Sequence, residues 1–268
     1  PDITEGGHTR RLRPRAGLSY RFGPGRALHA AYIESMHAPA SHTLAPVAVG
    51  AIAIDHQYQR LGSLARKRAV QLDWEIDART FAWGVLSSQS ITNPTFADGS
   101  LLVPNLGSSV SDRAGVLAPV GASGQVVIDA YNGNPYFSQG RLHQAGAALN
   151  RVLTPHWSVL GSYTWAHSRN TGAQHAGNLL PGVPQHIGVL ANVWRHGARD
   201  LTLASLVYRG SRFADEANTQ PQGAGWSFNL VLFRESADRR WAWTGTLQTP
   251  LHGTVRPTLW TSLRYRMD

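Results

Sequence analysis

The feature that most constrains this chain is a long two-residue alternation that occurs near both of its ends. In residues 11–22 apolar side chains occupy every even position, and Arg, Gly or Ser occupies every odd one. Residues 258–267 alternate in the same way, with Leu259, Leu263 and Tyr265 on one face and Arg264 and Arg266 on the other. Strands of soluble sheets usually have about five or six residues. Runs of ten or more that are apolar on one face and cationic on the other indicate a barrel wall with lipid outside and water inside.

Composition agrees with one large β domain that spans residues 1–268. The chain is 42% hydrophobic and 15% charged over 268 residues, as expected of a folded protein. No segment approaches the roughly 18 uninterrupted apolar residues of a membrane-spanning helix. A closed barrel is the other structure that pairs every backbone N–H and C=O group inside a bilayer. The sequence contains no cysteine, so disulfides and thiolate chemistry are excluded.

The net charge of +9 raises the question of a nucleic-acid partner. The basic residues are spread along strand faces and turns instead of forming a tail or one helix face, so we expect no nucleic-acid partner. The expected surroundings are a lipid bilayer and lipopolysaccharide. The sequence starts at Pro1 and shows neither an initiator Met nor the regions of a signal peptide. We therefore interpret it as the C-terminal part of a longer protein.

Short turns and long loops alternate along the sequence. This arrangement is typical of bacterial outer-membrane barrels, so we predict an all-β fold in that membrane. The fold is an antiparallel transmembrane β-barrel of about 11 to 12 strands with long extracellular loops and short periplasmic turns. Because such barrels have even strand numbers, a further strand is expected in sequence that precedes Pro1. The alternative is that residues 1–9 or the loop 91–139 supply it. The eleven strand-like segments are residues 11–22, 28–36, 64–76, 81–90, 141–153, 157–168, 185–194, 201–213, 226–234, 241–248 and 258–267.

Aromatic side chains follow the same layout, since Trp and Tyr prefer the membrane interfaces. Those within a few residues of a short turn or of the C-terminus are predicted to form a periplasmic interface belt: Tyr20, Phe22, Trp74, Phe81, Trp83, Trp157, Trp241, Trp243 and Tyr265. A second belt at the other strand ends would contain Tyr32, Tyr163, Trp165, Tyr208, Phe213 and Trp226. The alternation further predicts that the odd residues of 157–165 and the even residues of 226–232 face lipid. The alternative is that these are core aromatics of a soluble β protein.

Parts of the sequence resemble two families of outer-membrane proteins. LRPRAGLSYRFGPGRALHAAYIESMHAP, NLLPGVPQHI and TLWTSLRYRM resemble strand pairs, a loop-to-strand segment and the terminal strand of TonB-dependent receptor barrels. HTLAPVAVGAIAIDHQYQ and YRGSRFADEANTQPQGAGW are similar to C-terminal barrels of proteins with periplasmic tetratricopeptide repeats. Of these strings, ADEANTQP and TLAPVA are the most distinctive. The sequence itself contains no plug domain, no TonB box and no repeat of about 34 residues, and Met267 and Asp268 replace the usual terminal aromatic.

Catalytic and metal constellations are weak, so we predict no enzyme, no metal site and no cofactor. His167, His175 and His186 surround one loop but lack the short ligand spacing of metal sites. A hydrolase could combine His167 with Ser158, Ser162 or Ser168, but serine is ordinary on the wet face of a strand.

The predicted inner wall points to transport. A basic wall facing the lumen is formed by Arg11, Arg13, Arg15, Arg21, Arg264 and Arg266, and the two groups would be neighbours if the sheet closes. Gln71, Asp73 and Glu75 point inward elsewhere. Clustered cations beside an acidic patch favour passage or export of a small anionic solute or a polymer such as an anionic polysaccharide. The alternatives are a TonB-dependent uptake barrel, a plugged surface receptor, or a structural barrel in which Arg and acid pair to fill the lumen.

The upstream sequence would separate these functions. A tetratricopeptide-repeat domain there would favour polymer export, and a plug domain would favour TonB-driven uptake.

Two further arginines are predicted to face outward. Arg66 and Arg68 share strand parity with Val70, Leu72 and Trp74 but lie beyond the apolar segment, toward a long loop. We expect them to contact lipopolysaccharide phosphates through charge-assisted hydrogen bonds. The alternative is a solvated loop base.

Overall fold

The computed structural model describes most of the chain, namely residues 13–36, 48–54, 58–59, 63–93, 137–251 and 257–266. Every regular element in these ranges is a β-strand. No helix among the described residues is long and apolar enough to span a membrane.

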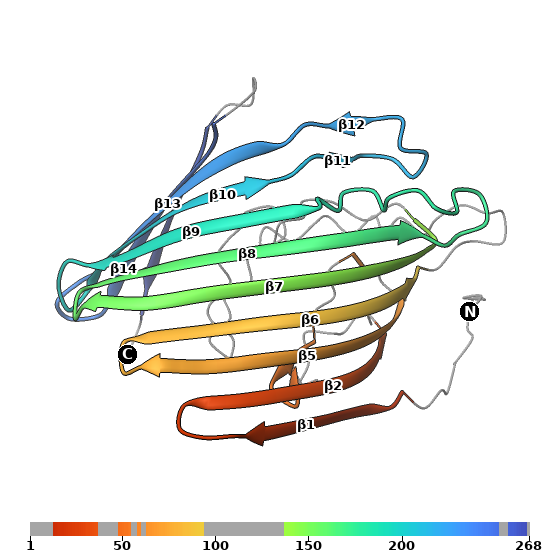
Figure 1. Ribbon diagram of the computed structural model, residues 1–268. Helices are drawn as coiled ribbons and strands as arrows, with labels where there is room; N and C mark the ends of the chain where they lie inside the picture. Colours follow the sequence, from red (N-terminus) through yellow and green to blue (C-terminus); the bar gives the residue numbers. More distant parts are fainter. Residues whose placement is uncertain are drawn as a thin grey trace.

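Eleven antiparallel strands form one curved sheet whose strand order is the order of the sequence (Figure 1). The prediction of eleven antiparallel strands is therefore confirmed, with bounds that differ by a few residues. The strands are β1 (Arg15–Arg21), β2 (Arg26–Met36), β5 (Leu64–Asp77), β6 (Thr80–Thr92), β7 (Gln139–Thr154), β8 (Trp157–Asn170), β9 (His186–Arg195), β10 (Asp200–Arg209), β13 (Gly225–Glu235), β14 (Trp241–Pro250) and β15 (Thr258–Tyr265).

The alternating sequence gives the sheet two different faces, because successive side chains of a strand point in opposite directions. On β8 the odd residues Tyr163 and Trp165 are exposed, whereas the even residues Ala166 and Ser168 are buried. On β13, Trp226 is exposed and its neighbour Ser227 is buried. The parity predicted for residues 157–165 and 226–232 matches this arrangement. We call the face with the exposed apolar side chains the outer face and the opposite one the inner face.

The two ends of the sheet differ in their connections. At one end, here called the turn end, the strands are joined by residues 22–25, 78–79, 155–156, 196–199 and 236–240. At the other, here called the loop end, the connections are long, and this is the predicted extracellular side. Two register shifts, between Glu75 and Asp77 and between Val152 and Thr154, both lie beside two-residue turns. Bulges of this kind are common at barrel rims.

A small hairpin from the first long loop packs on the inner face. It consists of β3 (Ala48–Val49) and β4 (Ile52–Ala53). Ile52 is buried in an apolar cluster with Ala31, Ile33 and Ala69 of the sheet wall. At Gly17 an added Cβ would lie 2.6 Å from the backbone nitrogen of Gly50, so the two backbones touch without intervening side chains. The hairpin therefore occupies inner space beside β1, β2 and β5.

The largest apolar cluster lies at the loop end of the inner face. It joins wall residues with residues of the connecting loops: Tyr58, Ala65, Ile91, Phe137, Leu142, Ala166, Leu180 and Val183. A second short hairpin, β11 (Arg212–Phe213) with β12 (Pro221–Gln222), extends the connection between β10 and β13. The loop end is thus packed, whereas the turn end has short local turns.

The two edge strands are exposed along their whole length. Every described side chain of β1 is exposed, as is nearly every one of β15. Among the described residues, β1 pairs with β2 and β15 pairs with β14, and the two edges are not paired with each other. Residues 1–9 and most of 91–139, in which a further strand was predicted, lie outside the described residues.

Candidate functional site

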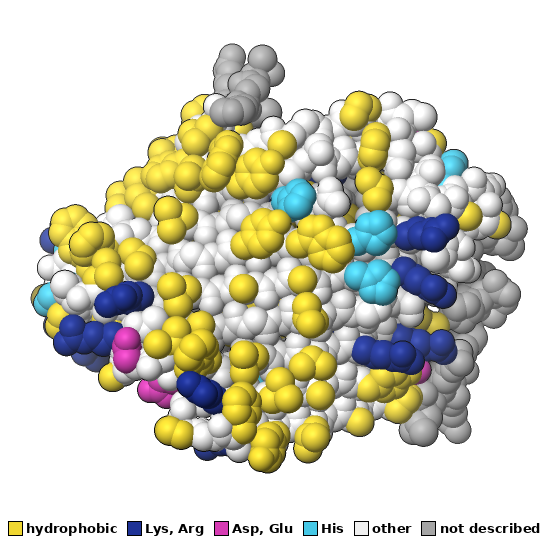
Figure 2. Space-filling view, viewed as in Figure 1, with side chains coloured by type: hydrophobic (Ala, Val, Ile, Leu, Met, Phe, Trp, Pro, Cys, Tyr) yellow, Lys and Arg dark blue, Asp and Glu magenta, His cyan; other side chains and the backbone are white. Residues whose placement is uncertain are grey.

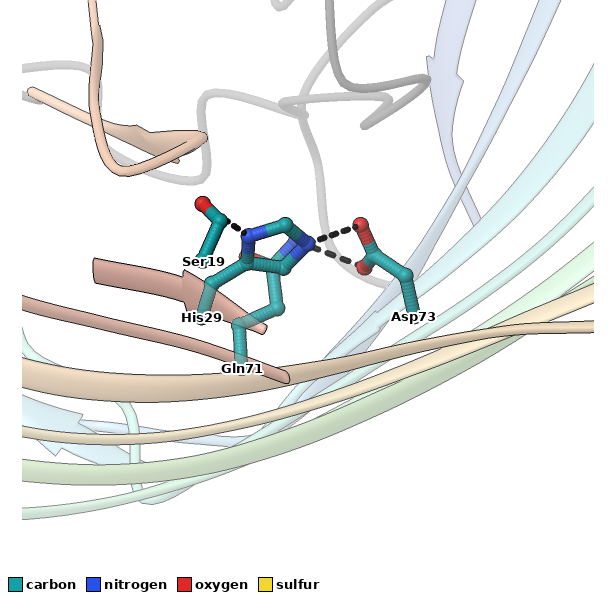
Figure 3. Close-up of polar contacts among 4 residues, drawn as sticks. All are labelled: Ser19, His29, Gln71 and Asp73. Atoms are coloured by element: carbon teal, nitrogen blue, oxygen red, sulfur yellow. Dashed lines mark hydrogen bonds and ion pairs between the residues drawn. The ribbon is translucent and has the colours of Figure 1, made fainter. Parts of the chain in front are cut away.

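A polar cluster lines the inner face of the first three strands of the sheet. The imidazole Nδ1 of His29 lies 2.9 Å from the Ser19 hydroxyl, and its Nε2 lies 3.1 Å from Oδ2 of Asp73 (Figure 3). The Gln71 amide donates to the other Asp73 oxygen at 2.7 Å. Gln71 is almost completely buried and His29 is 8% exposed. The cluster therefore satisfies polar groups within the wall.

Strand register brings this cluster together. Ser19 lies opposite His29, and His29 lies opposite Gln71, in three consecutive strands. Asp73 follows two residues after Gln71 and so points to the same face. Such cross-strand neighbours lie about 5 Å apart at Cβ, which is why one imidazole reaches both partners.

The order Ser, His, Asp is that of a nucleophile, a base and an orienting carboxylate. Acyl transfer also requires hydrogen-bond donors aimed at the developing oxyanion. His29 and Gln71 lie in strands that pair on both sides, so their backbone groups are engaged in the sheet. The geometry thus supports a polar wall more directly than a hydrolytic site.

The other serine and histidine candidates are separated by the sheet. Ser168 is buried on the inner face, where its hydroxyl accepts a hydrogen bond from Leu180 N–H at 3.1 Å, whereas His167 is exposed on the outer face. Ser158 and Ser162 share the parity of Ser168, so none of the three serines can be paired with His167 across the wall. Within the described ranges, no three His, Cys, Asp or Glu side chains are arranged to hold a metal ion.

The predicted basic wall is divided between the two edges of the sheet. Arg15 lies opposite the buried Ile33, and Arg264 lies opposite the buried Ala242, so both follow the inner-face register. Arg21 lies opposite Ala27 on the same face as His29. These strands are β1 and β15, which are not paired with each other in the described structure. The adjacency of the two arginine groups therefore stays a prediction.

The remaining arginines of that wall are placed as follows. The Arg13 guanidinium donates to the Met36 sulfur at 3.3 Å, beside β2. Arg266 directly follows β15, and its backbone N–H donates to the Arg240 carbonyl. Arg11 lies outside the described residues. Of the predicted acidic patch, Asp73 faces His29, and Glu75 adjoins the bulge at the turn end.

Glu216 connects three segments at the loop end. One carboxylate oxygen accepts from the Ser138 backbone N–H and from the Asn170 amide, both at 3.2 Å. The backbone carbonyl of Glu216 accepts from the Asn178 amide at 2.9 Å. Asn170 is almost completely buried, so its amide depends on this partner. Residues from the β6–β7, β8–β9 and β10–β13 connections are joined in this way.

The neighbouring residues Asp215 and Asn218 shape the loop that presents Glu216. Asp215 accepts hydrogen bonds from Thr219 and Gln220. Burial raises the pKa of Asp215, but these hydrogen bonds outweigh it and hold the pKa below its ordinary value. Asn218 adopts a φ of 58°, a left-handed conformation that Asn tolerates. Its side chain exchanges hydrogen bonds with the Leu179 backbone at 2.8 and 3.0 Å. The distinctive string ADEANTQP is therefore a loop-joining element.

Seven of the nine predicted periplasmic aromatics are exposed at the turn end: Tyr20, Phe22, Trp74, Trp157, Trp241, Trp243 and Tyr265. The register places the other two differently. Trp83 lies opposite Asp73 and the buried Ala148, and Phe81 lies two residues before it on the same face. Both side chains therefore follow the inner-face register, and their assignment to a lipid-facing belt was wrong. On β6 both faces are apolar near the turn, so nearness to the turn was a poor guide to direction.

Sequence reasoning missed two residues of interest. His29, the centre of the inner cluster, carries no local signal because its partners come from two other strands. Trp194 is 51% exposed near a short turn, where its ring packs on His196 with the ring centres 4.0 Å apart. Its position two residues before that turn was a sufficient signal for the aromatic belt.

Comparison with known proteins identifies the fold. No family model matches the sequence, and no curated protein is similar to it. Solved structures do match: the ferric yersiniabactin uptake receptor FyuA from Yersinia pestis, at 10% identity, covers 89% of this chain and 32% of its own, with a TM-score of 0.55. The copper transporter OprC, also at 10% identity, covers 93% and 38%, with a TM-score of 0.52. The siderophore receptor PiuA from Acinetobacter baumannii, at 13% identity, covers 88% and 31%, with a TM-score of 0.50.

These structures confirm the predicted outer-membrane β-barrel fold, and the outer-membrane location stays a prediction that fits this fold. They support the resemblance to TonB-dependent receptor barrels, whereas the resemblance to barrels with tetratricopeptide repeats stays a prediction. The chain spans about a third of the length of the structures that it matches.

Proposed function

We propose that this chain forms part of the wall of an outer-membrane uptake barrel for an anionic solute. The observation that carries the proposal is an inner face with hydrogen-bonded polar side chains below a packed loop end. Ser19, His29, Gln71 and Asp73 make that face polar on β1, β2 and β5. A polar lumen that opens below long extracellular loops is suited to the passage of a solute.

The direction of transport is supported by the proteins that share the fold. FyuA is an uptake receptor, PiuA is a siderophore receptor and OprC is a transporter for copper. Each of those chains is about three times as long as this one, so the whole activity is part of the proposal. A plug domain upstream and dependence on TonB would belong to the same proposal.

The anionic preference rests on the balance of charges along the inner face. Arg15, Arg21 and Arg264 follow the inner-face register on the edge strands. Asp73 and Glu75 carry the opposite charge on β5, whereas the three arginines lie on the edge strands β1 and β15. Fixed cations in a confined lumen raise the local concentration of anions.

Planar-bilayer measurements in a salt gradient test the proposal. We expect a reversal potential that indicates anion selectivity, and a shift toward cations in Arg15→Ser with Arg21→Ser. The shift should fade at high salt, since the screening length falls from about 8 Å at physiological ionic strength to about 3 Å at 1 M. Arg26→Ser is the matched control, because Arg26 lies on the outer face over the Trp74 ring. A cation-selective pore that the double variant leaves unchanged would contradict the proposal.

A plugged surface receptor is the second candidate, and the β3–β4 hairpin favours it. The hairpin packs on the inner face against Ala31, Ile33 and Ala69 and so fills part of the lumen. Absence of conductance together with solute binding would support this candidate over a pore. Export of an anionic polysaccharide would use the same wall, and adding solute to one side of the bilayer at a time separates it from uptake.

A further inference from the structure

Two rows of polar side chains cross the outer face near the loop end of β2 and β5–β8. Sequence reasoning found Arg66 and Arg68, but the register adds partners from four more strands. The upper row, in cross-strand order, is Glu34, Arg66, Ser90, Arg141 and Arg169. The lower row, two residues nearer the middle of the strands, is Tyr32, Arg68, Ser88, His143 and His167. Figure 2 shows Arg and His side chains gathered at this end of the outer face, beside the apolar surface.

The charges of these rows are unbalanced. Glu34 is their carboxylate, and it already holds Arg66, with Nε 3.1 Å from Oε1, and accepts from the Tyr32 hydroxyl at 2.6 Å. Arg141 lies directly opposite Arg169 in the adjacent strand. Like charges in directly opposite positions destabilise a sheet, and repulsion is stronger beside a low-dielectric medium. A bound anion between these guanidinium groups would convert the repulsion into attraction.

The rows lie at the depth of lipid headgroups. Twelve residue steps separate Trp157, at the turn end of β8, from Arg169. At about 3.3 Å per residue this is about 40 Å along the strand, or about 30 Å along the membrane normal for a strand tilted by about 40°. The apolar band of such a barrel is about 25 Å tall. Arg169 therefore lies just beyond the hydrocarbon region, with the exposed Trp165 ring on its membrane side.

A shallow apolar groove adjoins the lower row. It has a volume of about 780 Å³, and the residues that line it include Ala30, Val70, Leu86 and Ala145. These four residues face one another across β2, β5, β6 and β7, two positions from the lower row toward the middle of the strands. Arg68 and His143 of the lower row also line it, so a guanidinium and an imidazole border the apolar groove.

We infer that this surface binds a phosphorylated lipid of the outer leaflet. Arg68, Arg141 and Arg169 bind the headgroup phosphate by charge-assisted hydrogen bonds, with His143 and His167 as neighbouring donors. One acyl chain lies in the groove over Ala30 and Ala145. Arg is suited to this role because its planar fork matches two phosphate oxygens. The inference is independent of what crosses the lumen.

Native mass spectrometry of the detergent-solubilised chain with diphosphorylated lipid A tests the inference. We expect one lipid to be retained, and at least about tenfold weaker retention in Arg141→Ser with Arg169→Ser, since each charge-assisted bond contributes about tenfold. Arg151→Ser is the matched control, because Arg151 is exposed on the same strand as Arg141 but at its turn end. Ala145→Phe, which fills the groove, should weaken lipid A retention while leaving the arginines in place.

Further arms identify the source of the phosphate. The parent chain should retain lipid A without phosphates as weakly as the double variant retains diphosphorylated lipid A. Inorganic phosphate at millimolar concentration should not displace diphosphorylated lipid A from the parent chain. Equal retention of lipid A by the parent and by Arg141→Ser with Arg169→Ser would overturn the inference. Strong competition by inorganic phosphate would also overturn it, since the site would then belong to a free anion. Thermal unfolding of every variant without lipid shows whether each one folds.

Discussion

The two ends of the sheet are stabilised in different ways. Within the short turns of the turn end the side-chain hydrogen bonds are local, as in Asp77 with Arg79 and Thr80, or Ser236 with Asp238. At the loop end they join distant parts of the chain, as in Glu216 with Ser138 and Asn170. A turn closed by its own residues can change alone, whereas loops joined to one another change together. We therefore expect the loop end to respond to a mutation as one unit and the turns of the turn end to respond separately.

The largest expected effect tests whether the two ends lie on opposite sides of a membrane. Leu230 lies on the outer face in the middle of β13, and Ser162 follows the inner-face register of β8. Leu230→Arg should cost about 2 to 4 kcal/mol of folding free energy near the bilayer centre, whereas Ser162→Arg should be tolerated in a wet lumen. Folding into lipid vesicles at increasing urea concentration measures both. Equal costs for the two variants would refute the assignment of faces.

Removing the Glu216 carboxylate should loosen the whole loop end. Glu216→Ala leaves the buried Asn170 amide without its acceptor, which costs about 1 to 3 kcal/mol. Hydrogen exchange should rise in three loops at once, around Ser138, Asn170 and Asn178. An increase confined to the mutated loop would show that the loops are independent and would break the comparison.

Enlarging Gly17 should displace the inner hairpin. A Cβ at Gly17 would lie 2.6 Å from the Gly50 nitrogen, so Gly17→Val forces the hairpin away, at a cost of about 1 to 3 kcal/mol. Proteolysis within residues 48–54 should accelerate. Gly161→Val is the control, because nothing lies within 4 Å of an added Cβ there. Unchanged proteolysis in Gly17→Val would mean that the hairpin does not rest on β1.

Changes at the turn end should remain local. Asp238 accepts hydrogen bonds from the Ser236 hydroxyl and the Arg240 backbone within one turn. Asp238→Ala should cost less than Glu216→Ala and should raise hydrogen exchange in residues 236–240 alone. Exchange that also rises at the Asp77 turn would show coupling between turns.

Acid should weaken both ends through two aspartates. The Ser236 hydroxyl and the Arg240 N–H lower the pKa of Asp238, and hydrogen bonds within its loop lower the pKa of Asp215 against the effect of burial. A lowered pKa stabilises the fold above the unfolded value of about 3.9, and this contribution is lost as the pH falls through the folded pKa. Hydrogen exchange at pH 7 and pH 3 measures the loss. Asp215→Asn should abolish the pH response of the ADEANTQP loop and leave that of the 236–240 turn.

Strand number and face could be predicted from the sequence because alternation is a local property. Leu18, Tyr20 and Phe22 identify the outer face of β1 without knowledge of its neighbours. The prediction was wrong for Phe81 and Trp83, because Ala82, Gly84 and Leu86 make the other face of β6 apolar as well. Only the pairing of Trp83 with Asp73 and Ala148 resolves that choice.

The polar sites depend on register between strands, which no local pattern contains. His29 and Asp73 are 44 positions apart in the sequence, yet Nε2 of His29 lies 3.1 Å from Oδ2 of Asp73 because β2 and β5 are adjacent. Likewise, the outer rows appear only when Arg66, Arg141 and Arg169 are aligned across four strands. The single pair Arg66 and Arg68 was visible because both lie on one strand.

The two bulges beside the short turns bear on how such a wall tolerates insertions during evolution. A residue added in mid-strand would reverse every side chain beyond it and exchange the lipid-facing and lumen-facing sets. Between Glu75 and Asp77, and between Val152 and Thr154, an unmatched residue is already accommodated without that reversal. Single-residue insertions and deletions should therefore accumulate at these two places, and length changes within the remaining strand interiors should occur in pairs.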